Sequence, residues 1–169
     1  MLNLIGRSAA ERAKSVAICV LAGLLLLALW QLETQSALAT HEDQNRQVAV
    51  NVAKRFAIAL TTYDYAHPNA QLVTVAAVSS LVVQERVRAA FGDVVAAKAT
   101  SLGGVTGAIV TNLTASKADV LLETAQVVGG SYAETGTTLG GLLEVTVGQS
   151  GAGWVVVDFR WLLAPSGAA

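Results

Sequence analysis

The feature that most constrains this chain is an uncharged run near its N-terminus. Residues 15–32 read SVAICVLAGLLLLALWQL and contain no acidic or basic side chain. A transmembrane helix needs about 20 apolar residues, with roughly 17 to 25 acceptable, so this run is long enough to cross a membrane once. Trp30 lies near its end, where interfacial aromatic residues belong. We therefore predict a transmembrane helix over residues 15–32.

The charges on either side of this run predict its orientation. Arg7, Arg12 and Lys14 precede it, whereas Glu33 and further acidic residues follow it. Lys and Arg are retained on the cytoplasmic side of a membrane. We therefore predict that residues 1–14 are cytoplasmic and that the rest of the chain forms a domain outside the cytoplasm, at the inner or plasma membrane.

Two other interpretations of the run stay open. Ala37-Leu38-Ala39 has the A-x-A pattern of a signal-peptide cleavage site, so cleavage at Ala39 would release the domain. The length of the run argues against this interpretation, because the apolar region of a signal peptide usually has about 7–15 residues. A buried core helix is the third interpretation. The single cysteine, Cys19, follows Ile18, whereas a lipid-attachment site has a small residue there, so a lipoprotein is not expected.

The outer region divides into a stalk and first helix over residues 33–69, an α+β body over 70–163 and a tail over 164–169. Apolar residues at spacings of three and four predict the first helix from about Thr40 to Thr62, with Thr40 and Asp43 resembling a capping box. The residues of its apolar stripe are Val48, Val52, Phe56, Ala59, Leu60 and Tyr63.

Pro68 interrupts this helical pattern because it lacks an N–H group and restricts the residue before it. Asn69 is then a candidate cap for a second helix. Residues Leu81 to Phe91 predict a third helix, which ends at Gly92. One continuous helix over 70–91 is the alternative.

Beyond Gly92 the pattern changes to strands rich in Val, Ile, Thr and aromatic residues. Ser150 to Gly153 predicts a short hairpin connection, and Gly129 to Gly141 a longer loop. Short connections favour antiparallel pairing, so we expect an α+β fold with helices packed on the concave face of a curved antiparallel sheet. The expected strands are 94–102, 105–114, 119–128, 142–147 and 154–162.

Chemical motifs are almost absent. His41 and His67 lie far apart without the spacing of a metal site, and no nucleotide-binding or nucleophile motif occurs. Asp64, with Tyr63 or Tyr65, could act in acid–base catalysis only if burial raised the pKa of its carboxyl group. The favoured interpretation is a helix end in which Asp64 accepts hydrogen bonds from turn N–H groups. We predict no catalytic, cofactor or metal site.

Charge and aromatic content limit the remaining functions. The chain carries a net charge of −1, and its Lys and Arg residues beyond residue 40 are scattered, so we expect no nucleic-acid partner. Glu85, Arg86 and Arg88 are expected on a solvated face or in local ion pairs. A last set of large aromatic side chains is expected in the core: Trp154, Phe159 and Trp161.

A short cytoplasmic N-terminus, one transmembrane helix and an A-x-x-F-x-x-x-L-x-x-Y-D-Y stretch together resemble the Mce-associated membrane proteins. Here the stretch runs from Ala53 to Tyr65, and the similarity continues to a terminal Gly-Trp-Val-Val-Val-Asp at residues 153–158. The resemblance covers most of residues 10–162. It implies a cystatin-like roll, as in ketosteroid isomerase, and a non-catalytic accessory subunit of an Mce-type lipid transport complex in a bacterial envelope.

The inner-membrane scaffold proteins of type IV secretion and conjugation machines look similar in plan, with one anchor and the same roll. The implied partners are the membrane and the protein subunits of a transport or secretion complex, and a lipid is a possible ligand of the roll. An isomerase-like enzyme built on Asp64 and a tyrosine is the weakest of the alternatives.

Overall fold

The computed structural model describes residues 42–130, 133–151 and 153–167. The predicted transmembrane helix, its orientation, the Ala39 cleavage site, Cys19, the Thr40 cap and His41 lie outside the described residues and stay predictions. Within the described part of the chain, no helix is both long and apolar enough to cross a membrane. Gln44–Ala169 forms a compact unit, and the following paragraphs concern this unit.

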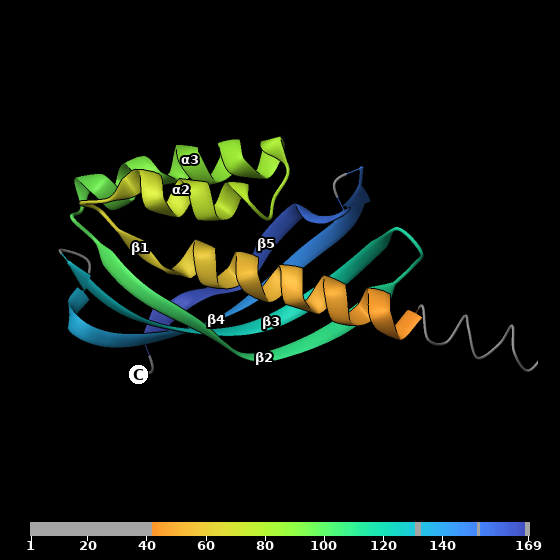
Figure 1. Cartoon of the computed structure of the whole chain (residues 1–169). Helices are drawn as coiled ribbons and strands as arrows, with labels where there is room; N and C mark the ends of the chain where they lie inside the picture. Colours follow the sequence, from red (N-terminus) through yellow and green to blue (C-terminus); the bar gives the residue numbers. More distant parts are fainter. Residues whose placement is uncertain (1–41, 131–132, 152, 168–169) are drawn as a thin grey trace, which may run out of the picture. The chain divides into compact units, whose positions relative to one another are not determined.

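Three described helices pack on one curled antiparallel sheet (Figure 1). A long helix covers residues 42–61. It is followed by β1 (Tyr63–Asp64), α2 (Pro68–Ala76) and α3 (Leu81–Ala96). The remaining strands, β2 (Thr100–Leu113), β3 (Lys117–Gly130), β4 (Ala133–Ser150) and β5 (Gly153–Gly167), follow each other in the sheet in the order β1-β2-β3-β4-β5. The predicted fold class, an α+β roll, is confirmed.

The long helix packs on the sheet through small side chains. Ala49, Ala53, Phe56 and Ala57 are fully buried, whereas Val48, which the apolar stripe predicted to face the core, is 43% exposed. Alanine stabilises helices without projecting far from the backbone, so an alanine face lets the helix approach the sheet closely. The sequence therefore identified the helix and part of its buried face, since Phe56 and Ala59 are buried, but it missed the alanines that complete this face.

Two separate helices follow, so the continuous helix over 70–91 is wrong. Pro68 occupies the first turn of α2 and His67 the cap position, which corrects the expectation that Asn69 caps this helix. The linker between α2 and α3 pairs with the edge of β5: Val156 N–H donates to Val78 O at 2.9 Å, and Ser80 N–H donates to Val156 O at 2.8 Å. These bonds require extended backbone at the linker, and this is why the helix breaks there.

The third helix is longer than predicted, and Gly92 lies inside it rather than at its end. The helix ends at Ala96, where Lys98 takes a left-handed conformation with φ of 50° and Ala99 N–H donates to Val94 O at 3.0 Å. The strand expected from Val94 was therefore wrong over 94–99, because the branched residues there belong to the last turns of a helix.

The Gly-rich stretch from Gly129 to Gly141 is not a loop, because β4 begins at Ala133. Gly140 and Gly141 pair with Ala125 and Thr124 of β3. A Cβ atom built on Gly141 would lie 2.9 Å from a ring carbon of Trp161, so this glycine makes room for an aromatic ring. The predicted hairpin connection is confirmed, since Ser150 pairs with Gly153.

The last strand extends to Gly167, through residues that the sequence predicted as a tail. It contains Pro165, which is tolerated because β5 is an edge strand and pairs with β4 alone over most of its length. The core lies between the helices and the inner face of β2 to β5. Among the rows that cross this inner face are Leu113–Ala118–Val147–Val156, Val110–Val120–Val145–Phe159 and Ala108–Leu122–Leu143–Trp161.

Candidate functional site

The Tyr63-Asp64-Tyr65 cluster, the most distinctive polar group in the sequence, forms β1 and the turn that follows it. Asp64 Oδ1 accepts a hydrogen bond from the Ala66 N–H at 2.9 Å, and Asp64 Oδ2 lies 2.9 Å from His67 Nδ1. The hydrogen bond to His67, followed by that to the Ala66 N–H, lowers the pKa of Asp64 from its ordinary value. The hydrogen bond predicted from a turn N–H group to Asp64 is confirmed, but Asp64 lies in β1 rather than at a helix end, and its pKa is shifted opposite to the direction that acid–base catalysis requires.

The outer face of the sheet, which points away from the helices, carries side chains from four strands. Because side chains alternate along each strand, the residues between the core positions share this face. The strand register aligns them into rows. The three central rows are Gly107–Glu123–Leu142–Leu163, Ile109–Leu121–Glu144–Arg160 and Asn112–Asp119–Thr146–Asp158.

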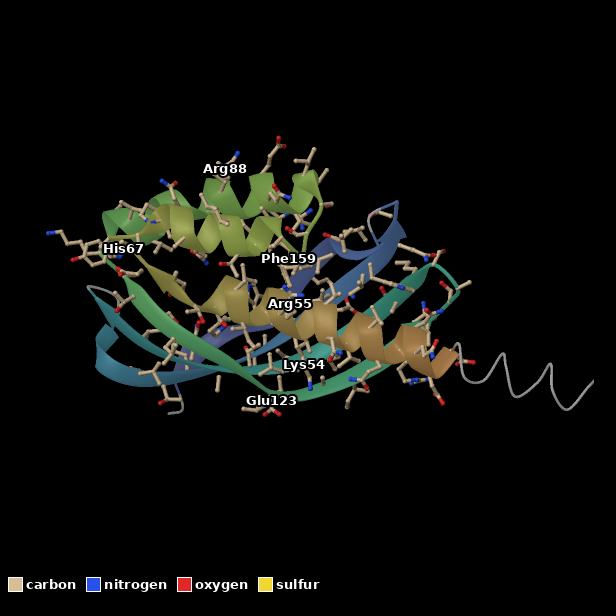
Figure 2. The ribbon with its side chains drawn as sticks, viewed as in Figure 1. Lys54, Arg55, His67, Arg88, Glu123 and Phe159 are labelled. Atoms are coloured by element: carbon tan, nitrogen blue, oxygen red, sulfur yellow. The ribbon has the colours of Figure 1, made fainter. Side chains whose placement is uncertain are left out.

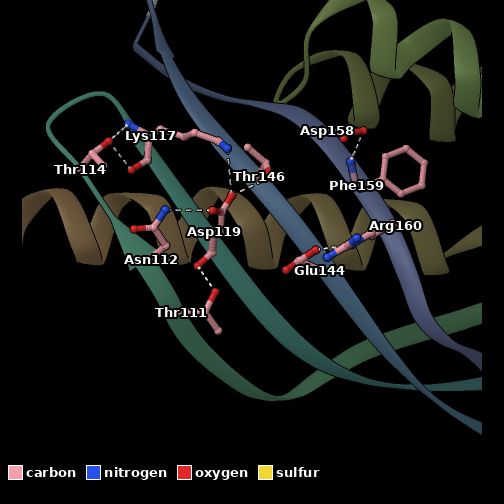
Figure 3. Close-up of polar contacts among 10 residues, drawn as sticks. All are labelled: Thr111, Asn112, Thr114, Lys117, Asp119, Glu144, Thr146, Asp158, Phe159 and Arg160. Carbon is pink, nitrogen blue, oxygen red and sulfur yellow. Dashed lines mark hydrogen bonds and ion pairs between the residues drawn. The ribbon is translucent and has the colours of Figure 1, made fainter.

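One end of this outer face is polar, and its charged side chains form hydrogen bonds and ion pairs with neighbouring residues of the sheet (Figure 3). Asp119 accepts hydrogen bonds from Thr146 Oγ1 at 2.7 Å and from Asn112 Nδ2 at 3.2 Å. Burial alone would raise the pKa of Asp119, but these two bonds and the nearby Lys117 ammonium bring it below its ordinary value. Such cross-strand pairs hold neighbouring strands in register.

Charged side chains on the last two strands, β4 and β5, are also paired within the domain. The Arg160 guanidinium forms an ion pair with Glu144 of β4, which raises the pKa of Arg160. Asp158 accepts a hydrogen bond from Arg86 of α3 at 2.7 Å, which is the largest cause of a lowered pKa at Asp158. The charged groups described at the polar end are therefore already paired within the domain, which leaves few of them to bind a partner.

The other end of the outer face is apolar. Four side chains from two adjacent rows lie there, and we call them together the outer apolar row: Ile109, Leu121, Leu142 and Leu163. Ile109 is 66% exposed and Leu163 is 58% exposed. These side chains border a hollow of about 530 Å³, whose lining also includes Gly107 and Gly140 on the same face. Contiguous exposed apolar side chains on a folded domain mark sites of protein association.

Glu123 is the charged residue among those that line this hollow. Its side chain points away from the helices (Figure 2), and the hollow is lined by Glu123 together with the outer apolar row. Among the described residues, no Lys, Arg or His pairs with its carboxylate, unlike those of Glu144 and Asp158. The outer apolar row therefore presents apolar surface around one negative charge that has no cation of its own.

Other residues that the sequence singled out have structural roles. Trp154, Phe159 and Trp161 pack against the core, as predicted, and the Phe159 ring lies 5.2 Å from that of Phe56. Arg86 is not in a local pair: it bridges α3 to β5 through Asp158, and its guanidinium lies 5.3 Å from the Phe159 ring centre. Within the described residues no group of three or more His, Cys, Asp or Glu could hold a metal ion.

The outer apolar row was missed by the sequence reasoning. The signal was available, because Glu123 and Leu121 alternate with the buried Val120, Leu122 and Thr124 along β3. Alternation alone does not show how strands align, so the rows that join Ile109 to Leu121 and Leu142 to Leu163 become visible only with the register.

The sequence matches no protein-family profile and no curated protein. Its fold does match solved structures. A periplasmic fragment of TraM superposes with a TM-score of 0.59 at 9% identity, covering 70% of this chain and 98% of that one. An IcmL-like type IV secretion system protein from Legionella pneumophila gives a TM-score of 0.56 at 16% identity, covering 73% and 94%.

CagV, a VirB8 homolog of the type IV secretion system from Helicobacter pylori, gives a TM-score of 0.55 at 9% identity, covering 68% of this chain and 96% of that one. The intermembrane-space region of the chloroplast protein ARC6 also matches, with a TM-score of 0.53 at 10% identity, covering 70% and 96%. At these identities the likeness shows the fold alone. None of the four is described as an Mce-associated protein.

Proposed function

We propose that this protein is a non-catalytic scaffold subunit of an envelope-spanning secretion-type assembly, with its roll domain outside the cytoplasm. The observation that carries the proposal is the fold match: the unit covers 94% or more of the periplasmic or secretion domains of TraM, the IcmL-like protein and CagV. This favours the secretion scaffold over the Mce-type accessory that the sequence resemblance put first. Because a fold hosts many functions, the site must carry the rest of the argument.

The outer apolar row supports a role in protein association. The exposed Ile109 and Leu163 line the same hollow as Glu123, whose charge has no cationic partner among the described residues. A complementary partner surface is apolar and places a Lys or Arg against Glu123, because opposite charges across an interface set its register and exclude wrong partners. We therefore propose that the occupant is another subunit of the assembly that carries such a basic residue.

The contacts of Asp64 support the absence of catalysis. Its carboxylate is held by its own turn through Ala66 and His67, and its pKa is lowered. A general acid in an apolar cavity needs the opposite shift.

The test is purification of the tagged full chain from its native membrane in a mild detergent, with copurifying proteins identified by mass spectrometry. Recovery of identified secretion-channel components is the expected result. Recovery of Mce-type permease or lipid-binding subunits would instead establish the accessory role in lipid transport. Recovery of the chain alone, or of a second copy of it, would refute the proposed hetero-association.

Variants of the outer apolar row test the surface itself. Ile109→Lys places a charge in the apolar hollow, and Glu123→Lys reverses the charge of Glu123. Each is expected to reduce partner recovery at least about tenfold, because burying an unpaired charge costs more than the about 1.4 kcal/mol that a factor of ten represents. Val73→Lys is the matched control, since Val73 is 70% exposed on α2. Equal losses in all three variants would contradict a specific role for the outer face.

A further inference from the structure

The sheet has a free edge along β2, which forms the lower border of the sheet in Figure 1. On that side β1 pairs with β2 only as far as Ser101, and no other described strand lies beyond β2. Gly103 faces the long helix, and its N–H group points to the free side, where it donates to Thr62 Oγ1 at 3.1 Å. Backbone and side-chain directions alternate together along a strand, so the inner-face residues Val105 and Ala108 also direct their N–H and C=O groups to the free side.

Two bulges in β2 leave this direction unchanged. Each inserts one extra residue, Thr106 or Thr111, into the pairing with β3. Their hydroxyl groups donate to β3, to Glu123 O at 3.4 Å and to Asp119 O at 3.1 Å. Because two residues of a bulge oppose one residue of the neighbouring strand, the alternation continues in phase beyond it. From Val105 to Leu113, β2 therefore presents edge-facing backbone groups that no described strand pairs.

The other edge of the sheet, along β5, is protected against the addition of a strand. The linker before α3 bonds to the backbone of Val156, and Arg86 Nη1 donates to the backbone oxygen of Phe159 at 3.1 Å. Pro165 adds a position without an N–H group. Natural proteins use coverage, charged side chains and proline to keep edge strands from pairing with other chains. Residues 100–113 of β2 contain neither proline nor a charged side chain, so β2 is the edge open to a further strand.

A carboxylate lies beside this open edge. Gly107 of β2 pairs with Glu123 of β3, and a Cβ atom built on Gly107 would lie 3.2 Å from Glu123 Oε2. The Glu123 carboxylate therefore lies over Gly107, which has no side chain to separate it from the free side of β2. A strand added beside β2 would lie about 4.8 Å further out, so a Lys or Arg opposite Gly107 can reach this carboxylate.

We propose that an extended segment of a partner protein adds antiparallel to β2, with a Lys or Arg opposite Gly107 that pairs with Glu123. The residue two positions away on the same face lies beside Ile109 and is apolar, because Ile109 is 66% exposed. In this mode of recognition, main-chain hydrogen bonds supply the affinity and alternate side chains supply the specificity. The inference rests on the proposed association role and specifies how the partner binds.

The charge of the site selects another protein rather than a second copy of this chain. β2 contains no Lys or Arg, so two β2 edges paired with each other offer no cation to either Glu123. Arg160 is the one basic residue of β5, but it forms an ion pair with Glu144 and lies on the protected edge strand.

The experiment uses a peptide probe of sequence Thr-Ile-Thr-Lys-Thr-Ile-Thr, with an uncharged fluorophore at its N-terminus and an amide at its C-terminus. When its Lys lies opposite Gly107, an Ile lies beside Ile109. A second peptide has Gln in place of Lys. Binding of both peptides to the full chain in a mild detergent is measured by fluorescence anisotropy.

The full chain is expected to bind the Lys peptide roughly 2- to 5-fold more tightly than the Gln peptide, as one solvent-accessible ion pair gives. Glu123→Gln keeps the size of the side chain and removes its charge, so it is expected to equalise the two affinities. Ala108→Pro removes an edge-facing N–H group that β3 does not use, and it is expected to weaken both peptides at least about 5-fold. Ala108→Val resembles Pro in size but keeps the N–H group, and it is expected to retain both affinities.

Three results would each overturn the proposal. The first is the absence of saturable binding of the Lys peptide up to about 1 mM. The second is equal affinity of the unaltered chain for the two peptides, which would exclude the pairing with Glu123. The third is equal weakening by Ala108→Pro and Ala108→Val, which would exclude hydrogen bonding at the edge.

Modified peptides keep the test decisive should Ala108→Pro fail to fold. In an antiparallel pairing the two Thr residues next to Lys direct their N–H groups to β2, whereas Lys directs its own away. N-methylation of these two Thr residues is expected to abolish binding, and N-methylation of Lys to retain it. Equal effects of the two modifications would overturn strand addition.

The copurification test separates this inference from the proposed function. Partner recovery that is lost in Ile109→Lys but kept in Ala108→Pro would retain the association role and overturn strand addition. Peptide binding with the expected discrimination, but without any recovered partner, would refute the secretion role and support the edge site.

Discussion

The end of the long helix lies very close to the sheet at Gly103 of β2. A Cβ atom built on Gly103 would lie 1.9 Å from Thr61 Oγ1, 2.3 Å from Thr61 Cβ and 2.9 Å from Thr61 O. Rotation of the Thr61 side chain cannot relieve the second and third contacts, because those atoms are fixed to the helix backbone. Gly103→Ala must therefore push the helix from the strand by about 1 Å to restore an ordinary carbon–carbon separation of about 3.5 Å.

The cost of this movement follows from what it breaks. Overpacking of a dense interior costs about 1–3 kcal/mol. The shift also disrupts the hydrogen bond from the Gly103 N–H to Thr62 Oγ1 at 3.1 Å, which contributes about 1 kcal/mol. We expect Gly103→Ala to lower the free energy of unfolding by about 2–4 kcal/mol.

Gly104→Ala is the matched control, because a Cβ atom built on Gly104 meets nothing within 4 Å. Urea unfolding of the 42–169 unit measures both variants, with an unchanged m-value as the condition for comparing midpoints. Gly104→Ala is expected to stay within about 1 kcal/mol of the unaltered unit. Adding Thr61→Gly to Gly103→Ala should recover part of the loss, so the double variant is less destabilised than the sum of the singles. A Gly103→Ala variant as stable as Gly104→Ala would refute the close helix–sheet contact.

Three further predictions concern the core, the acid response and the bridge from α3 to the sheet. Phe56→Ala removes a fully buried ring and should cost about 3–5 kcal/mol in urea unfolding, whereas Val48→Ala on the same helix, at a half-exposed position, should cost under about 1 kcal/mol. The pKa of Asp119 is lowered in the folded state, so the stability that this carboxylate contributes is present above its unfolded pKa of about 3.9 and is lost as the pH falls through its folded pKa. The Asp119→Asn variant should therefore lose less stability on acidification than the unaltered protein. Parallel curves of stability against pH for the two proteins would contradict this. Arg86→Met keeps the aliphatic stem but removes the contacts to Asp158 and the Phe159 ring, so amides of α3 should exchange faster with solvent while those of β3 keep their protection.

The sequence predicted the helices and the four long strands in the right order because their signals are local, but it missed β1, whose Tyr63 was assigned to the first helix. Helical periodicity identified the long helix, Pro68 marked the start of α2, and the Ser150–Gly153 connection marked a hairpin. The errors arose where local signals have a tertiary cause. Gly92 resembles a helix terminus, but the helix ends where Lys98 takes a left-handed conformation.

The glycines between residues 129 and 141 show the same limit. In the sequence they resemble a loop, whereas in the structure Gly141 lies in β4 against Trp161, which is twenty residues further along the chain. Only the fold shows which glycine serves a turn and which permits close packing.

The roles of polar residues also depend on the fold. Asp64, the most conspicuous candidate for chemistry, is held in a turn by Ala66 and His67. Gln71, which no motif marks, becomes unusual only because the end of the long helix takes both donors of its amide and leaves Oε1 buried. Whether a polar atom is available for a ligand depends on which partners the fold gives to its neighbours, and a sequence does not specify those partners.

The two faces of the sheet differ in how much of the stability of the domain depends on them. The outer apolar row consists of side chains whose removal leaves the core intact, since Ile109 and Leu163 are mostly exposed. On the opposite side of the sheet, Val87 and Phe91 are buried between α3 and the rest of the domain, so substitutions there are expected to cost more stability than substitutions at Ile109 or Leu163.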